Sequence, residues 1–132
     1  MIKSIPDGIY PTMVTPFTAD NKIDYNGVEA LLNWYSENGC DGVFAICQSS
    51  EIFFLSFEER LELLKFIMKN APKNLSIIAS GHTADDLDRQ IYEANAFISE
   101  LFPIELPGST KSRRLFGEKE EQGRRQMFSS EG

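Results

Sequence analysis

The sequence has few of the residues on which several common classes of function depend. Its 132 residues include two cysteines and one histidine, and 13 basic against 20 acidic side chains give a net charge of −7. The negative charge argues against nucleic-acid binding. Apolar runs are short and interrupted by charge, which excludes a membrane-spanning helix of about 20 residues. The first seven residues lack the apolar core of a secretion signal. Cys40 and Cys47 fit no zinc spacing, so we expect two buried thiols in a cytoplasmic protein.

The composition divides the chain into two unlike parts. Residues 1–95 hold 7 basic and 14 acidic side chains, whereas residues 96–132 hold 6 of each. From Pro103 onward the sequence has neither a strand alternation nor a helical apolar stripe, and it cannot bury enough apolar area to offset its ordering entropy. We therefore expect residues 1–95 to fold and residues 96–132 to form an irregular, poorly ordered tail.

Strand and helix patterns alternate through the first part. Apolar runs at residues 9–15, 42–47 and 75–79 predict three strands whose starts are about 33 residues apart, the length of a βα unit. Pro11 restricts the first strand to an edge or to its own first residues. Alternation of this kind implies a parallel sheet with right-handed crossovers.

Helix signals fill the gaps between these strands. Asp24 predicts one N-terminus and Gly39 the matching C-terminus, while Ser56 and Glu59 have the form of a capping box. Pro72 should stop this second helix, and Thr83 or Asp85 should open a third. The expected buried positions follow helical spacing in each: Val28, Leu31, Leu32 and Tyr35; Phe57, Leu61, Leu64 and Met68; Leu87, Ile91, Ala94 and Ile98.

An open doubly wound sheet and a closed barrel both satisfy this pattern, and the constant period favours the barrel. A fourth strand is due near residue 105, but Pro103 and Pro107 argue against a central strand there. A complete (β/α)₈ barrel needs roughly 250 residues. The predicted fold is therefore α/β: about three βα units from the N-terminal portion of a (β/α)₈ TIM barrel, followed by the tail.

Polar residues follow each expected strand, where parallel βα folds carry their working side chains. They are Thr15, residues 48–51 and residues 80–83. Hydroxyl and backbone N–H groups there suit a carboxylate or phosphate oxygen, although the same residues could simply cap helices. His82 could act as a base, but a solvated loop histidine explains it more simply. Asp85, Asp86 and Asp88 fit a helix first turn better than a metal site, so no metal is expected.

Three stretches resemble the dihydrodipicolinate synthase and N-acetylneuraminate lyase family. Residues 8–17, Gly-Ile-Tyr-Pro-Thr-Met-Val-Thr-Pro-Phe, are similar to its opening strand. Residues 47–51, Cys-Gln-Ser-Ser-Glu, fall where the family has Gly-Thr-Thr-Gly-Glu, and residues 55–60 resemble the Leu-Ser/Thr-x-Glu-Glu-Arg helix start that follows. Residues 80–82 fall at a Gly-containing loop of the family. The resemblance covers residues 7–94.

The resemblance implies a (β/α)₈ barrel, usually a homotetramer, in which a lysine forms a Schiff base with pyruvate or a related 2-keto acid. It implies aldol cleavage or condensation without a metal or organic cofactor. The family's Gly-Thr-Thr-Gly-Glu loop holds the keto-acid carboxylate. By position Gln48 and Ser49 stand for the two threonines, Cys47 and Ser50 replace the glycines, and Thr15 lies near the floor of the site. The expected substrate-binding residues are Thr15, Gln48, Ser49 and Ser50.

No residue of this chain is expected to be catalytic. The family places the Schiff-base lysine on its sixth strand and a proton-shuttling tyrosine on its fifth, and no lysine here follows a predicted strand. We expect a truncated or frameshifted family member, inactive alone, whose reading frame is lost between residues 93 and 100. The alternative is a non-catalytic, association-prone fragment that binds a partner chain. An open-sheet nucleotide-binding domain is a weaker third reading, because the Gly-rich phosphate motifs are missing.

Overall fold

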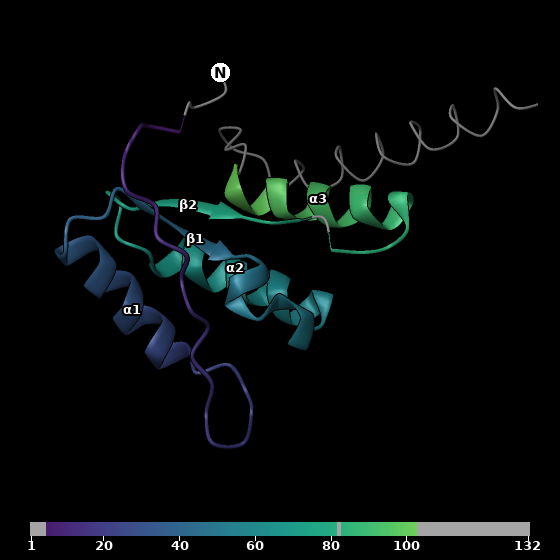
Figure 1. The fold of residues 1–132 in the computed structure, drawn as a ribbon, viewed down its shortest axis with the longest axis horizontal. Coiled ribbons are helices and arrows are strands. Elements are labelled where there is room, and N and C mark those ends of the chain that lie inside the picture. The colour runs from purple at the N-terminus through teal and green to yellow at the C-terminus, as the bar shows by residue number, and fades with distance from the viewer. Residues whose placement is uncertain (1–4, 82, 103–132) are drawn as a thin grey trace, which may run out of the picture. The chain divides into compact units, whose positions relative to one another are not determined.

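The computed structural model describes residues 5–81 and 83–102. His82 and everything predicted for residues 103–132 lie outside these residues. Chain contacts group Met1–Phe102 into one unit, separate from Pro103–Gly132. The division at residue 95 stays a prediction. The elements of the described part, drawn in Figure 1, are α1 (Tyr25–Glu37), β1 (Gly42–Ile46), the short 3₁₀ helices η1 (Gln48–Ser50) and η2 (Ile52–Phe54), α2 (Phe57–Asn70), β2 (Ser76–Ala79) and α3 (Leu87–Leu101).

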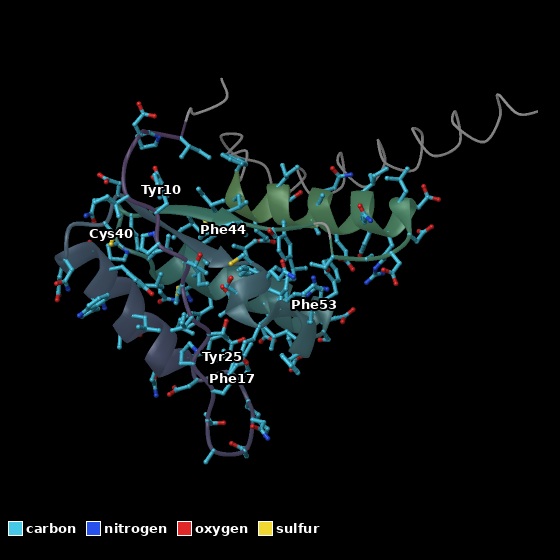
Figure 2. The ribbon with its side chains drawn as sticks, in the orientation of Figure 1. Tyr10, Phe17, Tyr25, Cys40, Phe44 and Phe53 are labelled. Atoms are coloured by element: carbon cyan, nitrogen blue, oxygen red, sulfur yellow. The ribbon has the colours of Figure 1, made fainter. Side chains whose placement is uncertain are left out.

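The strands form a parallel sheet, as the alternating pattern predicts. β1 pairs with β2 in a register that sets Val43 beside Ile77, with an irregularity after Phe44. On the opposite edge of β1, Thr12 forms a parallel bridge with Phe44, which is labelled in Figure 2. The order across the sheet is therefore residues 9–15, β1, β2, and each neighbouring pair is joined by a helical crossover.

The expectation of a regular strand at residues 9–15 is wrong, because these residues pair with β1 at a single bridge. Phe44 donates to the Pro11 carbonyl at 2.9 Å and Met13 donates to the Phe44 carbonyl at 3.0 Å. Pro11 has no N–H with which to extend this ladder toward the N-terminus. In the other direction the Met13 carbonyl accepts from Ser50 Oγ at 2.6 Å. The ladder is thus interrupted on both sides of the bridge.

The helix ends follow their sequence signals closely. Asp24 accepts from the Gly27 N–H, and Gly39 has the left-handed φ of 82° expected after a helix C-terminus. Ser56 and Glu59 form both hydrogen bonds of a capping box. α2 ends at Asn70, two residues before Pro72. The cap of α3 was expected at Thr83 or Asp85 but is Asp86, whose carboxylate accepts from the Arg89 N–H at 2.9 Å.

Burial agrees with the predicted stripes on α1 and departs from them on α2 and α3. Val28, Leu32 and Tyr35 of α1 are buried, with Leu31 half-buried against them. On α2 the stripe is rotated, because Leu63 and Ile67 are buried while Leu61 and Met68 are only half-buried. On α3 the predicted positions Leu87, Ile91 and Ile98 are exposed, and the helix buries Glu93 and Phe97 instead.

The difference on α3 has a structural cause. α2 lies between two paired strands in the sequence and packs against β1, whereas α3 follows the last strand of the described part. Its apolar stripe therefore has a strand on one side only.

Candidate functional site

The turn after β1 is fastened to residues 13–15 by buried hydrogen bonds. Thr15 Oγ1 donates to the Ser50 carbonyl at 2.7 Å, and Ser50 Oγ donates to the Met13 carbonyl at 2.6 Å. Cys47 Sγ lies 3.3 Å from Ser50 Oγ. The first two contacts join residues 35 or more positions apart, and they place the turn at the carboxyl end of the sheet, where parallel βα folds carry ligand sites.

The structure brings the four predicted binding residues together but divides them into two pairs. Thr15 and Ser50 are buried, and their hydroxyl groups are engaged in holding the turn. Gln48 and Ser49 lie in η1 with exposed side chains. The first pair is therefore placed to support the turn, and the second pair is accessible to a small molecule.

Cys47 and Ser50 do not need the conformational freedom of the glycines found at these positions in the family motif. Cys47 is extended, with φ −152° and ψ 179°, and the left-handed residue of this turn is Glu51, with φ 62° and ψ 33°. Ser50 is not among the positive-φ residues. A side chain at position 47 or 50 is thus compatible with the backbone of the turn.

The turn presents donors suited to a carboxylate. Ser50 N–H donates to the Cys47 carbonyl and Glu51 N–H to the Gln48 carbonyl. The preceding N–H groups, of Gln48 and Ser49, donate to no other group in the part of the chain that the structure describes. Two successive free N–H groups beside a serine hydroxyl can donate to an anionic oxygen.

The turn after β2 lies at the same end of the sheet. Ser80 N–H donates to the Ile46 carbonyl at 2.6 Å, which ties this turn to the end of β1. Gly81 sits against α3, and a Cβ there would lie 2.8 Å from the Cα of Ala94. Only glycine allows this close approach.

A buried ionic network holds the β2–α3 connection, and the sequence analysis missed it. Arg60 of α2 donates to Thr83 Oγ1, and its Nη2 lies 3.7 Å from Glu93 Oε2 on α3. Thr83 donates onward to Glu93, which also accepts from Arg89 Nε at 3.0 Å. The Cζ atoms of Arg60 and Arg89 lie 5.8 and 5.0 Å from the centroid of the Phe57 ring. Thr83, a predicted helix cap, serves instead to bridge two helices.

No sequence signal marked these charges as buried. Arg60 and Glu93 stand among many charged residues on helices whose exposed faces are charged in any case, and charged side chains are rarely buried. The burial of both side chains is explained by the ion pair between Arg60 and Glu93, which are 33 residues apart in the sequence.

Within residues 5–81 and 83–102, no three His, Cys, Asp or Glu side chains gather as a metal site would require. The helices described there are also too short or too polar to cross a membrane.

Fold and site together define a class of protein. The parallel strands β1 and β2, the extended segment bridged to β1, the connecting helices and a polar turn at the carboxyl end of the sheet match the opening units of a (β/α)₈ barrel, and solved TIM-barrel proteins superpose on this chain. Residues 5–87 match the model of the dihydrodipicolinate synthetase family, and the chain belongs to this family.

Individual relatives agree with that assignment. The chain is 34% identical over 77 residues to a 4-hydroxy-tetrahydrodipicolinate synthase of Polynucleobacter asymbioticus, a match that covers 58% of this chain and 25% of the relative. N-acetylneuraminate lyase from Mycoplasma synoviae superposes with a TM-score of 0.63 and 29% identity over 71% of this chain and 32% of the lyase. YagE of E. coli K12, solved in complex with pyruvate, gives 0.64 and 26% over 70% and 31%. The chain thus spans about a quarter to a third of the length of the proteins it matches.

Proposed function

We propose that the turn after β1 binds the carboxylate of a small 2-keto acid such as pyruvate. The observation that carries this proposal is the pair of free N–H groups at Gln48 and Ser49, held at the carboxyl end of the sheet by the Ser50 and Thr15 hydrogen bonds. A structural relative was solved with pyruvate, which supports this choice of ligand. Substrate contact by Gln48 and Ser49, with Thr15 and Ser50 beneath them, is part of the same proposal.

In the activity of the family, a lysine amine attacks the ketone carbon of the keto acid, and the adduct loses water to give a Schiff base. The Schiff base then undergoes aldol condensation or cleavage. Such a lysine must be partly neutral, and an apolar surrounding promotes this. The lysines of the described residues are Lys22, in an exposed loop, Lys65 and Lys69 on α2, and Lys73 just beyond it. None follows a strand. We therefore propose that the 132-residue chain binds a keto acid without forming a Schiff base, as a cytoplasmic member of a family whose enzymes are usually homotetramers.

Two measurements test these statements. Titration of the ¹⁵N-labelled full chain with pyruvate should shift the amide signals of Gln48 and Ser49, and a Ser49→Pro variant, which lacks one donor, should weaken binding. The control is Asn21→Gly in the exposed 18–22 turn. Asn21 has a left-handed φ of 61°, which glycine adopts readily, so this variant should bind pyruvate as the parent does. Unshifted Gln48 and Ser49 signals at saturating pyruvate would contradict the site.

Borohydride reduction in the presence of pyruvate, followed by mass spectrometry, tests the second statement. No lysine should gain the mass of reduced pyruvate. A labelled lysine would show that the chain carries out Schiff-base chemistry by itself.

A second candidate function rests on a different observation, the exposed apolar stripe of α3 and the unpaired outer edge of β2 within the described residues. Such surfaces bind other chains. In this reading the protein is a non-catalytic association module that binds a partner chain.

A further inference from the structure

The side chain of Arg60 joins the two connections that leave the carboxyl end of the sheet. Arg60 stands near the start of α2, and its Nε donates to the Ser56 carbonyl at 3.4 Å. Its Nη1 donates to Thr83 Oγ1 in the β2–α3 connection, and its Nη2 lies 3.7 Å from Glu93 Oε2 on α3. One buried guanidinium therefore holds the end of the connection that follows β1, the connection that follows β2, and the helix after it.

A further hydrogen bond closes a circuit around the turn after β1. Ser80 N–H donates to the Ile46 carbonyl at 2.6 Å, directly before this turn begins. The segment that carries the proposed keto-acid donors is thus bonded at its start to Ser80 and at its end, through Ser56, to Arg60. Because Arg60 also bonds Thr83, both ends of the segment are held by the same β2–α3 connection.

The buried charge of Arg60 is better explained by placement than by stability. Well-packed apolar residues of similar volume are often as stabilising as a buried ion pair, or more so. An apolar side chain, however, has no donors, and a lysine has a compact ammonium instead of a planar fork. The arginine supplies fixed directions toward three acceptors at once, which are the Ser56 carbonyl, the Thr83 hydroxyl and the Glu93 carboxylate.

We propose that Arg60 is a positioning residue of the keto-acid site. By bonding both Ser56 and Thr83 it fixes the turn after β1, so that the free N–H groups of this turn keep the directions in which a carboxylate binds. Arg60 acts without touching the ligand, because it lowers the cost of ordering the turn when the ligand arrives. This inference rests on the proposed function, since it concerns the same site.

Thr83→Val is the most selective test. It keeps the shape of the side chain and leaves the pair between Arg60 and Glu93 in place, but it removes the hydroxyl that closes the circuit. Pyruvate binding is measured by the amide shifts of Gln48 and Ser49 in the ¹⁵N-labelled full chain. The dissociation constant should rise about fivefold or more in Thr83→Val. Thr83→Ser restores the hydroxyl and should bind pyruvate as the parent does.

Ile67→Val is the matched control for a loss of stability alone. Ile67 is buried on the same helix, about 10 Å along its axis from Arg60 and away from the carboxyl end of the sheet. Removal of one methylene group there should lower the urea midpoint and leave the dissociation constant of pyruvate unchanged. A loss of affinity equal to that of Thr83→Val would show that general destabilisation weakens binding, and it would overturn the positioning role.

Arg60→Lys is a second variant, and it keeps the buried charge. Its ammonium can pair with Glu93 but cannot also bond Ser56 and Thr83 in the geometry of the guanidinium, so this variant should bind pyruvate as weakly as Thr83→Val does. A third measurement needs no substitution. Saturating pyruvate should slow the hydrogen exchange of the Ser80 amide in the parent, because a circuit that promotes binding is in turn stabilised by binding.

The outcomes distinguish the two proposals. Unshifted Gln48 and Ser49 signals in the parent at saturating pyruvate would overturn the keto-acid site, and the positioning role with it. If the parent binds pyruvate while folded Thr83→Val and Arg60→Lys variants bind it equally well, only the positioning role is overturned. If both variants lose their helical circular dichroism, an unchanged exchange rate of the Ser80 amide in the pyruvate-saturated parent overturns it instead.

Discussion

The Glu93 carboxylate should be among the most costly side-chain groups to neutralise in the described part of the chain. Its side chain is 5% exposed and that of Arg60 is 8% exposed, so neither charge is solvated by bulk water. Glu93→Gln keeps the size of the side chain but removes the only carboxylate paired with Arg60 among the described residues. The guanidinium then stays buried with the Thr83 hydroxyl and the Ser56 carbonyl as partners.

Breaking one side of a buried pair costs about 3–5 kcal/mol. We expect about 3 kcal/mol for Glu93→Gln, the lower end of that range, because the amide oxygen can still accept a hydrogen bond. The reverse change, Arg60→Met, should cost less, about 1–3 kcal/mol. Glu93 would keep its 3.0 Å contact with Arg89, whose side chain is 46% exposed and remains hydrated.

Urea denaturation followed by far-ultraviolet circular dichroism measures both changes in the free energy of unfolding. With a slope near 1 kcal/mol per molar urea, a loss of 3 kcal/mol lowers the midpoint by about 3 M. The double change Arg60→Met with Glu93→Leu should recover stability relative to Glu93→Gln, because no buried charge is then left unpaired on α2.

An exposed pair provides the control. Lys65 and Glu100 also join α2 to α3, at 3.8 Å, but their side chains are 51% and 27% exposed. Lys65→Met should therefore cost less than about 1 kcal/mol. The reasoning is refuted if Glu93→Gln costs no more than Lys65→Met, or if Arg60→Met is the more damaging of the two changes at the buried pair.

Three further changes test other contacts. Ser50→Ala removes the donor to the Met13 carbonyl and should lower the free energy of unfolding by about 1–3 kcal/mol in the same urea assay; a neutral result would contradict a buried, unsatisfied carbonyl. Ser56→Ala removes one half of the capping box and should cost about 1 kcal/mol, with loss of helical signal on heating at a lower temperature. Burial raises the pKa of Tyr25 above its ordinary value of 10.0, and the negative charges of Glu62 and Glu59 raise it further. The tyrosine therefore ionises first in the unfolded chain, and the free energy of unfolding falls as the pH rises past that value. A phenolate absorbance titration, compared with that of Tyr25→Phe, should show one tyrosine ionising late, and an ordinary Tyr25 titration would refute this.

Local signals in the sequence predicted the parts of the fold that depend on local chemistry. Asp24, Gly39 and the Ser56–Glu59 box each satisfy backbone groups within a few residues, so their sequence positions were sufficient to place the ends of α1 and the start of α2. The order of the strands and helices from α1 to α3 and the family followed from the βα period and three ordered motifs, and both are confirmed.

Features that depend on distant partners could not be read in the same way. The extended segment around Pro11 pairs at one bridge because Ser50, 37 residues beyond Met13, takes the carbonyl that a longer strand would use. Likewise Arg60 and Glu93 are buried only because each is near the other. In both cases the sequence shows a residue type with an ordinary local explanation, and the deciding partner lies in another element.

The α3 stripe shows a third kind of limit. Periodicity identified Leu87, Ile91 and Ile98 correctly as one apolar face, but periodicity describes what a helix can bury, not what is there to cover it. Glu93 and Phe97 contact α2 and are buried, while the predicted stripe of Leu87, Ile91 and Ile98 is exposed. The mismatch between an apolar pattern and its exposure therefore marks the face of α3 on which the second candidate function, association with a partner chain, rests.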